Sequence, residues 1–315
     1  MTAPAEALPG RPRRRAWLNL GLFLATAVTT LLAGSDLAAP PGPLTAAGVL
    51  EHGWPYAAAL LGILGAHEFG HYGLARWHGV EASLPYFIPV PFGVGTFGAV
   101  MRMRESPPSR RATLDIGVAG PIAGFAVALP LLLWGLAHSS VIDDTGLVRA
   151  GLDSPWALFL AWRDGRLQAT AAAGTIQYMG DSLVTWGAQR LVWGDLPPGK
   201  DLVLHPVAFA AWLGMLVTAL NLVPLGQLDG GHLTFALLGK ARAERASRVV
   251  SWALLACGLV LSWNWLVWWL LTRLAVGVRH PPAWDERPLD RPRLVLAVAG
   301  LVLFLLTFVP VPFAF

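Results

Sequence analysis

Cysteine and charged side chains are both scarce in this chain of 315 residues. Cys257 is the one cysteine, so no disulfide can form within the chain, and the redox compartment stays open. Charged residues make up 13% of the sequence, against roughly 25% in an average soluble domain. The hydrophobic fraction is 55% and the mean hydropathy is +0.55. These values exclude an ordinary soluble protein and predict a polytopic membrane protein.

The sequence also lacks the features of nucleic-acid-binding and nucleotide-binding proteins. Its net charge of +4 comes from arginines that cluster beside apolar runs, where they report membrane topology. No array of aromatic and basic residues accompanies these arginines, and no P-loop or internal repeat occurs. We therefore expect the lipid bilayer as a partner and no nucleic acid, and the oligomeric state stays open.

The motif HEFGH begins at His67, inside the apolar run 55–77, and a bilayer crossing takes about 20 residues. On a helix, His67 and His71 share a face and can reach one metal ion, with Glu68 beside them to act on water. In soluble helices, such a match often arises by chance among ordinary surface pairs. An ionisable group at mid-bilayer costs roughly 2.5–3.5 kcal/mol, so three in one crossing require a compensating partner. The motif therefore predicts a zinc site within the membrane.

The apolar runs predict an all-α membrane protein with about six transmembrane helices. A basic head at 1–16 precedes one integral membrane domain at 17–315. The first run is expected to be an uncleaved signal anchor, because it exceeds the usual apolar core of a signal peptide and no cleavage site follows closely. The expected crossings are 17–33, 55–77, 112–137, 206–238, 249–277 and 294–313.

The segment 249–277 allows two arrangements. It can be a single crossing, or the sequence SWN at 262–264 can be the turn of a short re-entrant hairpin. In the second arrangement the last helix reverses its direction, and the C-terminus lies outside.

Clusters of arginine predict the orientation. If RPRRR at 11–15 is cytoplasmic, the basic clusters at 102–111 and 240–248 fall on the same side of the membrane. This topology brings HEFGH and the LDGG sequence at 228–231 to similar depth, near the cytoplasmic leaflet. We therefore expect the two motifs to meet.

The run 206–238 contains two ionisable side chains, Asp229 and His232. A proline flanked by glycines is expected to break its helix, which frees backbone groups that protein or water must satisfy. The alternative is a merely kinked packing helix, which leaves the buried Asp229 unexplained. Because deep charge is concentrated at HEFGH and here, a shared metal is the economical arrangement. Its ligands would be His67, His71 and Asp229, with a fourth position open to water.

Three motifs together resemble the site-2 protease family of intramembrane zinc metalloproteases. They are HEFGH, the GxxGPxxG pattern of GVAGPIAG at 117–124, and NLVPLGQLDGGH at 221–232. The resemblance covers most of residues 55–248 in order and spacing. FGAVMRMRESPPSRRATLDIGVAGPIAG and the later TRLAVGVRHPP are similar to the subgroup that includes the plastid EGY proteases and their bacterial relatives.

This resemblance implies one Zn²⁺ per chain, held by His67, His71 and Asp229, with Glu68 as the general base. Asn221 matches the family asparagine that helps to hold substrate or the transition-state oxygen, although an amide there can equally cap the broken backbone. The implied reaction is hydrolysis of peptide bonds within or next to the transmembrane segment of membrane-tethered substrates. We expect a multi-pass protein of the bacterial cytoplasmic membrane, with its active site near the cytoplasmic leaflet.

Two regions between the crossings have their own patterns. Residues 83–100 are too broken by proline and glycine for a helix, and their alternation predicts short strands that re-enter the membrane. Such an edge can pair with an unwound substrate, and a packing loop is the alternative. The polar insertion at 139–205 contains amphipathic candidates with tryptophans, typical of a membrane interface or of a small extramembrane cap.

Two other functions remain open at this point. A metal-binding membrane transporter also buries histidine and aspartate, but it typically has paired discontinuous helices in two halves. An inactive protease-like scaffold would usually have lost a ligand or the glutamate. Here all four residues are present: His67, Glu68, His71 and Asp229.

Overall fold

The computed structural model describes residues 13–38, 45–103, 106–143, 152–164, 178–275 and 287–314. Within these ranges the chain is mostly helical, as predicted, and three two-stranded antiparallel sheets accompany the helices. Most of the predicted basic head, parts of the polar insertion and part of TRLAVGVRHPP lie outside the described residues.

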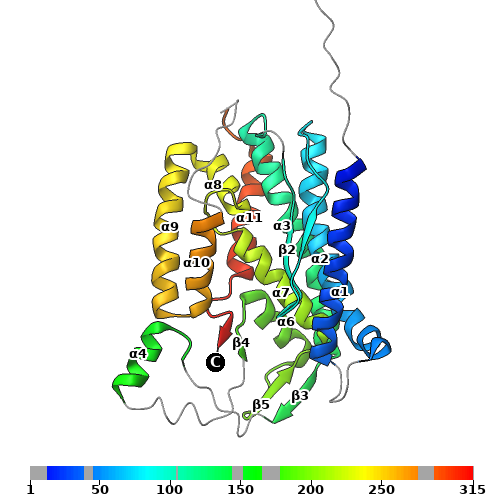
Figure 1. Cartoon of the computed structure of the whole chain (residues 1–315). Helices are drawn as coiled ribbons and strands as arrows, with labels where there is room; N and C mark the ends of the chain where they lie inside the picture. The colour runs from blue at the N-terminus through cyan, green and yellow to red at the C-terminus, as the bar shows by residue number, and fades with distance from the viewer. Residues whose placement is uncertain are drawn as a thin grey trace, which may run out of the picture.

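Three long helices lie side by side in the N-terminal half: α1 (Arg13–Ala38), α2 (Ala46–Trp77) and α3 (Arg110–Ala137) (Figure 1). Helix α2 starts well before the predicted crossing 55–77, because the Thr45 hydroxyl caps its N-terminus by accepting the Gly48 N–H at 3.1 Å. Apolar content marked the rest of this helix up to its last residue, Trp77, whereas the first turns, which contain Glu51 and His52, were missed.

Length and apolarity qualify two helical segments as candidate membrane crossings, Ala16–Ala38 and Arg110–Ala137. The first lies near the N-terminus, where a signal sequence passes the same test, and part of the second is buried among other helices. Pro206–Asn221 is apolar but shorter. The expectation of about six crossings therefore has direct support for two of them.

The run 206–238 forms two helices, as the predicted break requires. Helix α7 (Pro206–Asn221) ends before an irregular segment that contains Pro224, and α8 (Asp229–Leu238) follows it. The start of α8 folds back onto the end of α7 so closely that a Cβ on Gly230 would lie 2.0 Å from the Leu222 carbonyl oxygen. Asp229 is thereby placed at the first turn of a short buried helix.

The segment 249–277 is a helical hairpin, not a single crossing. Helices α9 (Lys240–Val260) and α10 (Trp263–Ala275) pack against each other on either side of a turn at Leu261 and Ser262 (Figure 1). The backbone N–H of Trp263 donates to the Asp153 carbonyl at 2.7 Å, which fixes the turn to the polar insertion.

The last helix, α11 (Arg291–Thr307), is shorter than the predicted crossing 294–313. It ends before Pro310 and Pro312, which lack the N–H that a continuing helix needs. Strand β6 (Phe313–Ala314) then pairs with β4 (Tyr178–Met179) of the polar insertion. The C-terminal residues thus lie at the same end as the insertion, as the hairpin alternative for 249–277 required.

The two ends of the molecule differ in composition. Figure 1 shows the first turns of α1, α3 and α9 and the last turn of α2 at one end, which therefore carries the described parts of the basic clusters. At the opposite end, β3 (Ser140–Asp143) pairs with β5 (Lys200–Val203). The insertion also contains the amphipathic helices α4 (Pro155–Arg163), with two exposed tryptophans, and α6 (Leu183–Trp193), with one.

The predicted strands within 83–100 form a hairpin of β1 (Tyr86–Pro89) and β2 (Thr96–Val100). Helix α1 holds the hairpin, because the Asn19 amide donates to the carbonyls of Leu84 and Pro85 at 2.9 and 2.8 Å. Helix α2 holds its tip, where the Tyr56 hydroxyl donates to the Val94 carbonyl at 2.8 Å. The hairpin is therefore attached to the helical core at its base and at its tip.

Candidate active site

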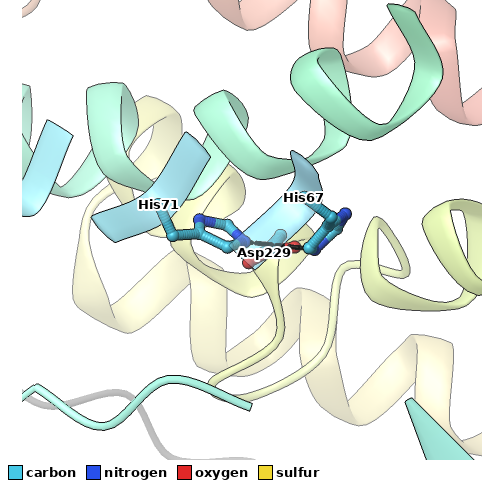
Figure 2. A group of neighbouring side chains, drawn as sticks. All are labelled: His67, His71 and Asp229. Carbon is cyan, nitrogen blue, oxygen red and sulfur yellow. Dashed lines mark hydrogen bonds and ion pairs between the residues drawn. The ribbon is translucent and has the colours of Figure 1, made fainter. Parts of the chain in front are cut away.

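His67 and His71 of α2 meet Asp229 of α8 inside the helical core (Figure 2). The two Nε2 atoms lie 3.1 Å apart, and each lies 3.3 Å from Oδ2 of Asp229. Both histidines are buried, and the Asp229 side chain is 13% exposed. The structure thus brings HEFGH and LDGG together.

This triangle of donor atoms has the dimensions of a zinc site. Donors bound at about 2.0–2.1 Å in a tetrahedron lie roughly 3.3–3.4 Å from one another. The three separations in the structure are 3.1, 3.3 and 3.3 Å. Two imidazoles and one carboxylate are a typical set for catalytic zinc, with the fourth position open. Among the described residues, no other group of three or more histidine, cysteine, aspartate or glutamate side chains is close enough to hold a metal ion.

The glycines of GVAGPIAG on α3 make room for the histidines. A Cβ on Gly120 would lie 2.1 Å from Nε2 of His71, and a Cβ on Gly124 would lie 3.2 Å from Cβ of His67. The sequence indicated close helix contact at this motif, but it did not indicate which groups make the contact. The structure shows that the glycines lie against the two histidine side chains.

A backbone carbonyl orients His71. Its Nδ1 lies 2.7 Å from the Ile116 carbonyl oxygen on α3, and a carbonyl can only accept, so Nδ1 carries the proton. The lone pair of Nε2 then points at Asp229, as a metal ligand requires. Sequence analysis missed Ile116, because a backbone acceptor leaves no side-chain signal.

Glu68 is buried beside the donor triangle but is not part of it. Its carboxylate accepts a hydrogen bond from the backbone N–H of Met101, just after β2. The candidate base is therefore fixed against the strand hairpin.

Asn221 is the last residue of α7, and its Nδ2 lies 3.3 Å from Nε2 of His67. This position is consistent with the predicted role of Asn221 in holding substrate or the transition-state oxygen, and that role stays a prediction. Its amide points at the donor triangle and can donate a hydrogen bond there.

A cavity of about 520 Å³ opens onto these groups, within the usual range for ligand sites of roughly 300–1,000 Å³. Its walls come from α2, from β2 and the chain that follows it, from α3, and from the segment between α7 and α8. Besides the groups described, it is lined by Ala99, Val100, Arg102, Met103, Ser106, Pro107, Gly117, Gln227, Leu228 and His232.

Residues 55–263 match the family described as Peptidase family M50. The chain belongs to this family. It is the site-2 protease family that the motifs indicated, so the resemblance is confirmed, and the prediction of a zinc metalloprotease agrees with it.

Relatives of this M50 chain include the "Probable zinc metalloprotease EGY2, chloroplastic" of Arabidopsis thaliana, 31% identical over 306 residues, which cover 95% of this chain and 50% of that protein. The "Probable zinc metalloprotease EGY1, chloroplastic" of the same plant is 31% identical over 260 residues, 82% of this chain and 43% of that protein. The chain spans about half the length of the curated relatives it matches. No solved structure matches it.

Proposed function

We propose that this chain is an intramembrane zinc metalloprotease that cleaves membrane-tethered proteins within or next to their transmembrane segments. The observation that carries the proposal is the convergence of His67, His71 and Asp229 in one cavity with Glu68. Membership of family M50 and the names of the relatives support the metal and the reaction class.

The roles of the side chains follow from their positions. His67, His71 and Asp229 would hold one zinc ion, which supplies Lewis-acid polarisation of the scissile carbonyl and lowers the pKa of water towards about 7. Glu68 accepts the proton of the attacking water and delivers it to the leaving nitrogen. Asn221 donates a hydrogen bond to the oxygen that becomes negatively charged in the transition state.

The substrate binds as a strand against β2. Within the described residues β2 is an edge strand, paired with β1 on one side, and Ala99, Val100 and Met101 line the cavity. Strand addition there would present a peptide bond beside Glu68. Because the amides of a helix are internally bonded, the substrate must unwind, and helix-breaking residues near the cut are expected.

We also propose that the remaining apolar helices cross the bilayer and that the site lies near the cytoplasmic leaflet. The basic clusters share one end of the helical core, and positive charge favours the cytoplasmic side. Placement in a bacterial cytoplasmic membrane rests on the motif resemblance alone.

Metal analysis and cleavage assays on the purified protein test the activity. We expect one zinc per chain in wild type, loss of zinc in His67→Ala and Asp229→Ala, and retained zinc in Glu68→Gln. Cleavage of a membrane-tethered reporter should fall in Glu68→Gln by about 10²–10⁴-fold, because the base is lost. Zinc flux into vesicles without cleavage would favour a transporter, and bound zinc with neither would favour a scaffold.

Thiol labelling in intact cells tests the orientation, in a Cys257→Ser background. Ser140 and Ala241 are exposed at opposite ends of the molecule, so a cysteine at either position can react with a thiol reagent. The nearby Ser154 and Ser247 are buried and therefore unsuitable for labelling. An impermeant reagent should label Ser140→Cys at once and Ala241→Cys only after the membrane is opened. The reverse pattern would place the site near the outer leaflet.

A further inference from the structure

A cluster of charged groups lies beside the candidate site and takes no part in the proposed chemistry. Its centre is Asp115, the carboxylate of the apolar run 112–137, whose side chain is 13% exposed. Arg293 of α11 donates to it from Nε, 3.0 Å from each carboxylate oxygen, and from Nη2, 2.7 Å from Oδ2. His78, which caps the C-terminus of α2, places Nε2 2.9 Å from the same Oδ2. Asp115 therefore joins three helices.

The cluster adjoins the hydrogen bond that orients a zinc ligand. Asp115 directly precedes Ile116, whose carbonyl accepts the Nδ1–H of His71 at 2.7 Å. His78 lies about two turns beyond His71 at the end of the same helix. Contacts on Asp115 thus fix α2 and α3 relative to each other close to the bond that directs His71.

Helix α11 also packs against α8, the helix that carries Asp229. A Cβ on Gly300 would lie 3.2 Å from Cδ1 of Leu233 on α8 and 3.4 Å from Cγ2 of Val118 on α3. Both side chains belong to one core cluster with Ala297 of α11. Arg293 therefore anchors the helix that packs between the two elements carrying the ligands and their support.

We propose that Asp115, His78 and Arg293 are positioning residues that hold the Ile116 carbonyl against His71 and thereby set the zinc affinity and the turnover rate. This inference rests on the proposed function. Arg293 lies beyond residues 55–263, which match the family, so the last helix supplies a part of the site from outside that region. Outer hydrogen-bond partners of metal ligands typically change affinity or activity by about 10–100-fold.

Zinc affinity and kinetics of the purified full chain test the inference. Asp115→Asn and Arg293→Ala should weaken zinc binding, measured by chelator competition, by about 10–100-fold and lower kcat with KM unchanged. Arg293→Lys keeps the charge but loses the planar fork, so it should restore part of the affinity. The double variant should be no worse than the stronger single variant, because both changes break one contact.

Arg111→Ala is the matched control. Arg111 also joins α3 to the start of α11, with hydrogen bonds to the Pro288 carbonyl and Nη1 3.6 Å from Asp290. It shares Asp290 with Arg293, whose Nη1 lies 2.7 Å from that carboxylate, but no contact is described between Arg111 and Asp115. It should leave zinc affinity and kcat within about twofold, since single exposed pairs contribute little.

The thermal unfolding of the zinc-free variants separates positioning from folding. Equal zinc affinity and kcat in folded Asp115→Asn, Arg293→Lys and wild type would overturn the inference, whatever the unfolding temperature. If wild type binds zinc but cleaves no peptide, the proposed function fails while the affinity comparison still decides the role of the cluster.

Discussion

The two halves of the candidate site are built in opposite ways. His67 and His71 lie in the last third of one long helix, where the Ile116 carbonyl and Gly120 define the position of one ring. Asp229 lies at the first turn of a short helix that follows an irregular segment. The comparison teaches that a continuous helix fixes the direction of the imidazoles, while the helix break makes room for the cavity and brings in the charge.

The largest expected effect on zinc binding comes from a change at the half of the site that the continuous helix α2 carries. Gly120→Ala would place a methyl group 2.1 Å from Nε2 of His71, so the ring must leave the donor triangle. We expect zinc binding to fall at least about 100-fold, with cleavage lost, as measured by metal analysis and the reporter assay. Gly65→Ala on α2 is the control, because a Cβ there has no neighbour within 4 Å. Normal zinc in Gly120→Ala would show that the continuous half is more compliant than its geometry indicates.

A smaller effect is expected on the broken half. The buried Ser247 hydroxyl on α9 accepts the backbone N–H of Gly226 at 3.2 Å, which ties the irregular segment down. Ser247→Ala leaves that amide unpaired, which costs about 1–3 kcal/mol of unfolding free energy. We expect faster amide hydrogen exchange between α7 and α8, and zinc binding weakened less than in Gly120→Ala. If Ser247→Ala bound zinc more weakly than Gly120→Ala, the segment before α8 would matter more for zinc binding than the position of the His71 ring, contrary to this comparison.

The smallest effect concerns the far end of α7. His205 caps this helix, with its Nδ1 accepting the Val207 N–H at 3.2 Å, and burial together with nearby His138 lowers the pKa of His205. The unfolded state then binds more protons, so the contribution of His205 to stability is complete above about pH 6.5 and declines below it. His205→Asn keeps a good cap that does not titrate. Between pH 7 and pH 5 the unfolding temperature of wild type should fall more than that of the variant, and parallel curves would remove His205 as the cause.

The members of the candidate site were predictable because they are chemical exceptions in their surroundings. An ionisable side chain stands out in an apolar run, as His67, Glu68, His71 and Asp229 do, and proline with glycine marks the helix break. The strands of the hairpin were predictable from a different signal, the proline, glycine and alternating pattern of residues 83–100. The roles of these residues stay predictions, whereas their meeting is seen in the structure.

Other features could not be read from local sequence. The pairing of Asp115 with Arg293 joins distant positions, and the acceptor for His71 is a backbone oxygen, so neither has a motif. The turn at Leu261 and Ser262 contains neither glycine nor proline, which left 249–277 open. The early end of α11 did have a signal, in Pro310 and Pro312, that the apolar pattern outweighed.

The donor triangle has a mechanical consequence in a chain with one cysteine and therefore no disulfide of its own. With zinc bound, His71 and Asp229 are cross-linked across the long stretch of chain between α2 and α8. Because these ligands lie far apart in an unfolded chain and meet only in the folded one, the free energy of zinc binding adds to the free energy of folding. A chelator that removes the ion would therefore lower the stability of this protein, as a reducing agent lowers the stability of a disulfide-bonded one.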